Sequence, residues 1–473
     1  MRPSIVLIAI LCAQTAGAQA ALTPHQRAAR EIYSELISIN TVDSVGSVTK
    51  AAEAMAARFR AAGFPDADVK VLIPPGKPTK GNLVVRYRGR AGGQKPILLL
   101  AHLDVVAALR SDWPRDPFTL HEENGYFLGR GSSDDKAMAS IFVANLLRMK
   151  AQGVQPTRDI ILALTADEEG GDANGAEWLV KEHRDLVDAA YAINEGGGGT
   201  LAGTGMDVKP LFHSVQAAEK VYQDFTLTAT NPGGHSSVPR PDNAIYQLAD
   251  ALARLPKFAF PVALNPTTRA FFEQTAKVEK PEIAAAMRAI VANPGDTAAA
   301  AFLSRDPRYA SMLRTTCVAT RLMGGHAYNA LPQSATANVN CRMVPTSSSA
   351  EVRATLARVI ADTGIKITNT QAQEPEFPKS TLPIDAAVLA ATTEITKSMF
   401  GDIPVVPTMS TGATDSHYFR AVGIPSYGIS GIFSTPGETN AHGRDEKLRV
   451  KSYYDGLEFL DQLVRRLTGG VQP

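Results

Sequence analysis

Short apolar runs alternate with helical patterns between Lys80 and Glu195, and this alternation constrains the fold more than any other feature of the chain. The apolar runs are NLVVRY, PILLLAHLD, RDIILALTADEE and AAYAINEGGG. KAMASIFVANLLRMKAQG and GAEWLVKEH have helical spacing and lie between the later runs. Continuous apolar strands separated by helices are typical of a mostly parallel sheet covered on both faces. The sequence therefore predicts an α/β domain.

Polar residues follow several apolar runs, at the points where strands are expected to end. These residues are His102 with Asp104, Asp134 with Asp135, Glu168 with Glu169, Glu195, and His442. In open α/β sheets, this carboxyl edge is where ligands bind. Two histidines, one aspartate and two glutamates suit zinc or a similar divalent ion, and the spacing leaves open whether one or two ions bind. Each cluster alone has an ordinary explanation, such as a surface His–Asp pair, so the prediction depends on their occurring together.

Glu168 and Glu169 place two negative charges directly after an apolar run, with no Lys or Arg nearby in the sequence. Burial of unpaired carboxylates is costly, so a bound cation is the expected compensation. Because successive side chains of a strand point to opposite sides, one glutamate can bind metal while the other acts as a general base. By the same alternation, Asp104 points the same way as His102 and can orient its imidazole.

The pattern changes after Gly199, where KVYQDFTLTAT and SATANVNCRMV alternate like half-exposed strands. Amphipathic helices are expected nearby, so we predict a smaller α+β domain, with the Ala-rich AAFLSRDPRYASML as a helical segment within it. The α/β pattern resumes after the Pro-rich EPEFPKSTLP. We therefore predict a main domain formed by residues 21–213 and 381–473, with residues 214–380 inserted into it.

The first 20 residues, MRPSIVLIAILCAQTAGAQA, have a basic start, a short apolar stretch and small residues where cleavage is expected. We expect residues 1–20 to be a signal peptide, the alternative being an ordinary N-terminal apolar helix. The mature chain would then be secreted without a membrane anchor, into the periplasm if the source is a Gram-negative bacterium. The formal net charge of +1 disfavours nucleic acid and anionic membranes as partners.

Cys317 and Cys341 are the cysteines outside that segment. An exported chain permits a disulfide between them, and two buried free thiols are the alternative.

Eight segments carry a resemblance to a known family: AHLDVV, WPRDPFTLHEENGYFLGRGSSDDKA, ADEEGG, NEGGG, NPGGHSS, NALPQSATANVNCRMVP, ATDSHYFR and AHGRDE. In this order they resemble the motifs of the co-catalytic zinc exopeptidases, the family of carboxypeptidase S, carnosinase, carboxypeptidase G and aminoacylase. The resemblance extends from about Pro96 to the C-terminus, and TGATDSHYFR is most similar to the branch of carboxypeptidase S and the N-acyl-amino-acid hydrolases. It implies a phosphorylase/hydrolase-like α/β catalytic domain with an inserted lid and dimerisation domain.

The resemblance also implies the metal ligands. Asp134 would bridge two zinc ions, with cobalt or manganese as alternative metals. His102 and Glu195 would complete one site, and Glu169 and His442 the other.

Further roles follow from the same resemblance. Glu168 would be the general base, Asp104 would support His102, and the peptide bond after Asp134 would be cis. In the inserted domain, His235 would stabilise the oxyanion, often across the interface of a homodimer. Asn329 and Arg342 would bind substrate, with Arg342 as a bidentate clamp for a terminal carboxylate.

These features predict a di-zinc metallopeptidase that hydrolyses the amide bond next to a free carboxylate in short peptides. An aminoacylase-type enzyme acting on N-acyl amino acids is the alternative, because both substrates present the same carboxylate beside the same amide. A peptide-binding module that only retains the metal site belongs to a different class, as does a structural surface protein, which would not need Glu168.

Overall fold

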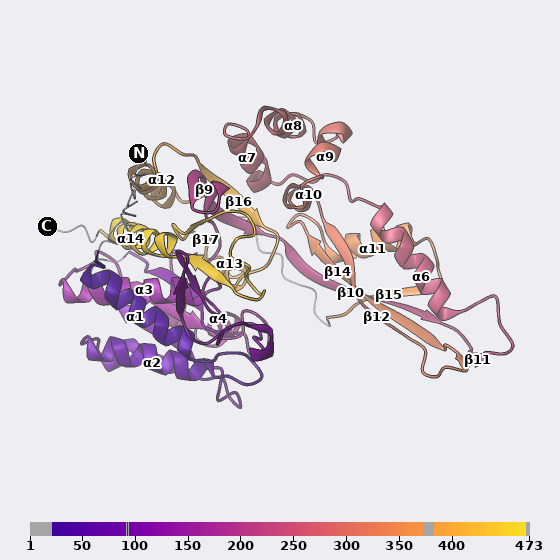
Figure 1. Cartoon of the computed structure of the whole chain (residues 1–473), viewed down its shortest axis with the longest axis horizontal. Helices are drawn as coiled ribbons and strands as arrows, with labels where there is room; N and C mark the ends of the chain where they lie inside the picture. Colours follow the sequence, from indigo (N-terminus) through magenta and orange to yellow (C-terminus); the bar gives the residue numbers. More distant parts are fainter. Residues whose placement is uncertain (1–20, 91, 93, 372–382, 470–473) are drawn as a thin grey trace, which may run out of the picture.

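The computed structural model describes residues 21–90, 92, 94–371 and 383–469. A large α/β domain and a smaller α+β domain lie beside each other, at left and right in Figure 1. The predicted signal peptide and most of the Pro-rich stretch lie outside the described residues.

A ten-stranded sheet forms the centre of the large domain. Its middle strands β6, β3, β7 and β17 run parallel, and antiparallel strands extend the sheet on both sides, so the sheet as a whole is mixed. Across the sheet, the strands are β1 (Val69–Leu72), β2 (Asn82–Tyr87), β6 (Ile160–Thr165), β3 (Ile97–His102), β7 (Tyr191–Asn194), β17 (Ser426–Gly428), β9 (Asp207–Glu219), β8 (Gly198–Thr204) and β18 (Phe433–Ser434), with β16 (Val405–Ser410) paired to β9 off this path.

Both faces of this sheet are buried, which explains why its strands are continuous apolar runs. Leu99 and Leu162 belong to one core, whereas their neighbours Leu100 and Ala163 belong to the other. The first core is covered by α1 (Pro24–Ser38), α2 (Val48–Ala61), α3 (Lys136–Ala151), α12 (Ala386–Phe400) and α14 (Val450–Leu467). The second is covered by α4 (Gly175–Glu182), α5 (Arg184–Val187) and α13 (Ser416–Ala421).

A small sheet joins two distant segments of the chain. It consists of β4 (His121–Glu123), β5 (Tyr126–Leu128) and β19 (Lys447–Arg449). The pairing of β5 with β19 places the residues after β5 beside the segment that precedes β19. Short 3-10 helices lie at Asp66–Asp68 (η1), Arg110–Asp112 (η2) and Leu255–Lys257 (η3).

The smaller domain is an antiparallel sheet with helices on one face. In order across this sheet, the strands are β12 (Thr316–Gly324), β14 (Ser334–Met343), β10 (Val221–Thr230) and β15 (Ile365–Asn369). The helices α6 (Ala244–Arg254) and α11 (Ser349–Ile360) cover its apolar face. A two-stranded ribbon, β11 (Gly234–His235) with β13 (Ala330–Leu331), lies at the end farthest from the large domain (Figure 1).

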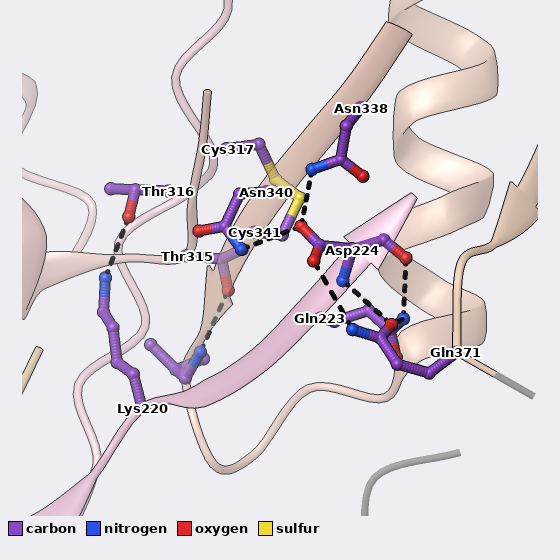
Figure 2. The surroundings of a disulfide bond; sticks show 11 residues. Lys220, Gln223, Asp224, Thr315, Thr316, Cys317, Asn338, Asn340, Cys341 and Gln371 are labelled. Atoms are coloured by element: carbon purple, nitrogen blue, oxygen red, sulfur yellow. Dashed lines mark hydrogen bonds between the residues drawn. A yellow bond between two sulfur atoms is a disulfide. The ribbon is translucent and has the colours of Figure 1, made fainter. Parts of the chain in front are cut away.

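Cys317 on β12 and Cys341 on β14 face each other across the strand pair and form a disulfide (Figure 2). The structure thus selects the disulfide over two free thiols.

Four helices interrupt the smaller domain in sequence: α7 (Pro266–Thr275), α8 (Pro281–Ala292), α9 (Thr297–Leu303) and α10 (Pro307–Leu313). They share a hydrophobic core with Val406 of β16, and Phe212 of β9 packs against that core. This helical segment therefore packs on strands of the large sheet.

The described residues contain no helix that combines the length and the apolar character needed to cross a membrane.

His213 of β9 is a fully buried titratable group in the large domain. Its Nδ1 lies 2.7 Å from Thr396 Oγ1, and its ring contacts those of Phe433 and Phe459. Burial lowers the pKa of His213 to about 3, so the folded protein holds it neutral.

We expect His213 to make the protein less stable in mild acid. Because its folded pKa lies below the unfolded value of about 6.5, protonation favours the unfolded chain, and stability is lost as the pH falls below 6.5. Between about pH 6 and pH 4, the unfolding free energy of His213→Asn should fall less steeply than that of the wild type, by about 1.4 kcal/mol per pH unit. Urea titrations at several pH values measure these slopes, and equal slopes would contradict the prediction.

Candidate metal centre

Three neighbouring parallel strands end at the same edge of the large sheet. β3 ends at His102, β6 ends at Thr165 shortly before Glu168 and Glu169, and β7 ends directly before Glu195. Because parallel strands present their carboxyl ends together, residues far apart in the sequence meet there.

Two groups of potential ligand atoms form at this edge. His102, Asp134 and Glu195 make one group, Asp134, Glu169 and His442 make the other, and within each group the ligand atoms lie within 4.8 Å of one another. Asp134 belongs to both groups: its Oδ1 lies 3.0 Å from His102 Nε2, and its Oδ2 lies 3.2 Å from His442 Nε2. His442 Nε2 is also 2.8 Å from Glu169 Oε2. The structure therefore brings all five predicted ligands together around Asp134.

The charge balance of these groups fits divalent cations. The ion-pair partners of the three carboxylates within the cluster are the imidazoles of His102 and His442. Burial raises the pKa of Glu169 to about 7 and raises that of Glu195 well above its ordinary value, with neighbouring carboxylates adding to the effect. Bound cations would relieve this repulsion, and imidazole and carboxylate are suitable ligands for zinc.

Asp104 orients both parts of the site. Its two carboxylate oxygens accept hydrogen bonds from the backbone N–H groups of Glu168 (3.2 Å) and Glu169 (3.0 Å). Its backbone carbonyl accepts from Nδ1 of His102 (3.1 Å), and its Oδ1 lies 3.6 Å from the same nitrogen. These contacts leave Nε2 of His102 facing the ligand groups. The peptide bond between Asp134 and Asp135 is cis, as predicted.

The turn before the glutamate pair is held by an ion pair. Asp167 has a left-handed φ of 59°, and its buried carboxylate lies 2.5 Å from Lys80 Nζ. The same carboxylate accepts a hydrogen bond from the backbone of Ala173. Lys80 lies far from Asp167 in sequence, so this cationic partner could not be expected from the local pattern.

Glu168 lines the cavity beside the ligand cluster. Neither ligand group found among the described residues includes it. Burial raises the pKa of Glu168 to about 9, and the negative charges of Asp415, Asp134 and Glu169 act in the same direction. A carboxylate in this position can hold a proton beside the reacting groups.

The cavity has a volume of about 620 Å³ and reaches from the ligand cluster to the smaller domain. On that side it is lined by Lys220, Tyr222 and Arg342, and the guanidinium of Arg342 lies 4.6 Å from the centre of the Tyr222 ring. Lys220 Nζ donates to Thr316 Oγ1 (3.2 Å; Figure 2). Arg342 thus faces the same cavity as Glu168, which places a cation where a substrate carboxylate could bind.

Sequence reasoning missed several residues of this cavity. Lys220 and Tyr222 follow the end of β9 and carry no motif that marks them. Asp415 is buried and accepts hydrogen bonds from Thr165 (2.7 Å) and Asn174 (2.8 Å). Asp415 lies in ATDSHYFR, one of the segments that resemble family motifs, and this position is the signal that could have identified it.

His235 and Asn329 lie elsewhere, at the ribbon of β11 and β13. His235 is exposed and its Nδ1 lies 2.7 Å from Ser237 Oγ, while the backbone of Ser236 donates to the carbonyl of Asn329 (3.0 Å). Neither residue lines the cavity of its own chain. Their predicted roles remain predictions, and those roles require a second subunit or movement of the smaller domain.

Residues 98–466 match the sequence profile of the peptidase family M20/M25/M40. Similar proteins include probable carboxypeptidase S-like 2 of Dictyostelium discoideum, 29% identical over 390 residues (81% of this chain and 74% of the relative). Human N-fatty-acyl-amino acid synthase/hydrolase PM20D1 is 27% identical over 383 residues (80% and 75%). Mouse aminoacylase-1 is 27% identical over 387 residues (81% and 83%).

Solved structures show the same fold. The M20 family metallo-carboxypeptidase Sso-CP2 from Sulfolobus solfataricus aligns with a TM-score of 0.68 at 18% identity, covering 92% of this chain and 98% of that chain. The Bacillus subtilis YXEP protein, a dinuclear metal binding peptidase from the M20 family, aligns with a TM-score of 0.57 at 11% identity (94% and 99%).

Removing divalent ions should lower the stability of the protein. An ion at one hundred times its dissociation constant stabilises the folded state by about 2.7 kcal/mol per site. Chemical unfolding curves with added zinc should therefore have a higher midpoint than curves with a chelator. In His102→Ala, which lacks one ligand, zinc should raise the midpoint less. Identical wild-type curves with zinc and with chelator would contradict a metal centre.

Proposed function

The chain belongs to the peptidase family M20/M25/M40, and on this basis we propose that it is a di-zinc hydrolase that cleaves the amide bond next to a free carboxylate in short peptides. Family membership makes it a metal-dependent hydrolase of the metallopeptidase and amidohydrolase type. The two-zinc centre and the carboxypeptidase or dipeptidase specificity are our proposal.

One observation carries the proposal: two ligand groups share Asp134, and Glu168 and Arg342 line the same cavity beside them. The ligands supply nitrogen and oxygen atoms only, which suits zinc and also accommodates cobalt or manganese. This combination provides a metal centre, a proton carrier and a carboxylate-binding group within reach of one substrate.

Different residues of the chain carry out different steps of the proposed reaction. When bound, the two zinc ions would polarise the scissile carbonyl and lower the pKa of the attacking water. Glu168, which would ionise once bound cations offset the burial that raises its pKa, accepts the proton of that water and delivers it to the leaving amine. Arg342 binds the free carboxylate of the substrate, since its planar fork matches two carboxylate oxygens. His235, supplied by a partner subunit, would donate to the oxyanion.

N-acyl amino acids are the second candidate substrates. The relatives named aminoacylase-1 and N-fatty-acyl-amino acid synthase/hydrolase favour them, and these substrates carry the same carboxylate next to the amide. A panel of dipeptides and N-acyl amino acids, assayed under identical metal loading, separates the two candidates by kcat/KM.

We also propose that the chain forms a homodimer through its smaller domain. β12 is an edge strand of its sheet, and Val318, Leu322 and Met323 on it are exposed. An exposed apolar edge favours pairing with another chain, and a second copy would also bring a second His235 into the assembly.

We also propose that the chain is exported to an oxidising compartment such as the periplasm. The disulfide between Cys317 and Cys341 supports this location, because disulfides form and persist in such compartments.

Replacing Glu168 by glutamine should lower kcat by about 10²- to 10⁴-fold, because the amide cannot transfer the proton. Metal analysis of the variant should still give the wild-type zinc content, since Glu168 lies outside both ligand groups. Activity close to that of the wild type would exclude Glu168 as the proton carrier.

Arg342→Ala should reduce kcat/KM by about 10- to 100-fold for substrates with a free carboxylate, because a charge-assisted contact is lost. Analogues in which the carboxylate is converted to a carboxamide should lose much less. Steady-state kinetics on matched pairs of substrates test this difference, and an equal loss on both members of a pair would rule out the clamp.

A further inference from the structure

We propose that Arg130 is a positioning residue that fixes the loop carrying His442, so that ion binding by Asp134, Glu169 and His442 depends on the buried Arg130–Glu446 pair. This inference rests on the proposed two-ion centre. It assigns a role to two residues outside both ligand groups.

The two histidines of the centre are held very differently. His102 is the last residue of β3, is 1% exposed, and donates through Nδ1 to the backbone of Asp104. The side chain of His442 is 56% exposed and lies in the irregular segment between β18 and β19. Strand pairing thus fixes the first histidine, whereas the second needs support from other contacts.

The backbone of the His442 segment is itself unfavourable. Asn440, His442 and Asp445 have φ values of 51°, 62° and 50°, which lie in the left-handed region. Such conformations are unfavourable for residues other than glycine and persist where surrounding contacts fix them.

Arg130 supplies contacts of this kind. Its Nη2 lies 3.4 Å from the carbonyl oxygen of His442, 3.0 Å from that of Gly443 and 3.3 Å from that of Ala107. Its guanidinium also lies 5.2 Å from the centre of the Trp113 ring. A single guanidinium therefore joins the His442 loop to the segment that follows β3.

Glu446 connects the same guanidinium to the loop of Asp134. Its Oε2 accepts from Nη1 of Arg130 (2.8 Å) and from the backbone of Gly131 (3.0 Å). Its Oε1 accepts from the backbone N–H groups of Ser133 (2.7 Å) and Asp134 (3.1 Å). The side chains of Arg130 and Glu446 are only 3% and 1% exposed.

The contacts separate two roles within the pair. Glu446 holds the backbone of Asp134, which both ligand groups share. Arg130 holds the carbonyl groups of His442 and Gly443, and this loop contributes a ligand to one group only, through His442. A lysine at position 130 would keep a positive charge near Glu446 but would lack the planar fork that reaches several acceptors. Arg130→Lys should therefore weaken one ion site and spare the other.

The test measures two zinc dissociation constants for the purified full chain, by competition with a chelating dye. In Arg130→Lys, one of the two constants should rise by about 10- to 100-fold, as is usual when a residue that orients a metal ligand is changed, while the other constant stays the same. His442→Ala identifies the affected site, because it should lose the ion whose constant rises in Arg130→Lys.

Arg420→Lys is the matched control. The side chains of Arg420 and Glu219 are each 1% exposed, and Nη1 of Arg420 donates to Glu219 Oε1 (2.8 Å). Arg420 also donates to the carbonyl of Ser426, and these partners lie on β9 and β17, outside the segment of His442 and the loop of Asp134. Both zinc constants should remain at wild-type values in this variant.

Three results would overturn the inference: unchanged constants in Arg130→Lys, equal weakening of both ions, or the same loss in Arg420→Lys. A wild-type chain that binds fewer than two ions would instead contradict the two-zinc centre itself, and the inference with it.

Discussion

Repulsion among buried carboxylates is the constraint on which the rest of this site depends. Asp134, Glu169 and Glu195 converge at one edge of the large sheet, and the chain places two imidazoles against them. Bound divalent cations would stabilise such an arrangement, because each would add two positive charges to it. The surrounding polar groups, such as Asp104, then serve to orient the ligands rather than to neutralise them.

The residues of the site come from two parts of the fold, the carboxyl edge of the parallel strands and segments that pack beside it. Parallel strands present His102 and Glu195 directly, whereas His442 arrives from a loop beside the small sheet of β4, β5 and β19. The smaller domain contributes Arg342 and Tyr222 to the lining of the cavity. A substrate would therefore be bound by one domain and cleaved by groups of the other.

Much of this architecture could be predicted from local sequence. Apolar runs such as ILLLAH identify strands buried on both faces, and polar residues at their ends identify the edge where ligands meet. Contacts between distant segments could not be predicted. The contact of Asp104 with the amides of Glu168 and Glu169, the Lys80–Asp167 pair and the Arg130–Glu446 pair each depend on how segments far apart in the chain pack. The alternation of side chains along a strand also could not predict that His235 lies outside the cavity of its own chain.

The arrangement of cations around Asp134 is the central claim, and anomalous X-ray diffraction from zinc-loaded crystals tests it most directly. We predict two zinc peaks, one about 2.0–2.2 Å from ligand atoms of His102 and Glu195 and one equally close to those of Glu169 and His442, with Asp134 bound to both and Glu168 to neither. A single peak at this edge of the sheet, or zinc coordinated by the carboxylate of Glu168, would contradict it.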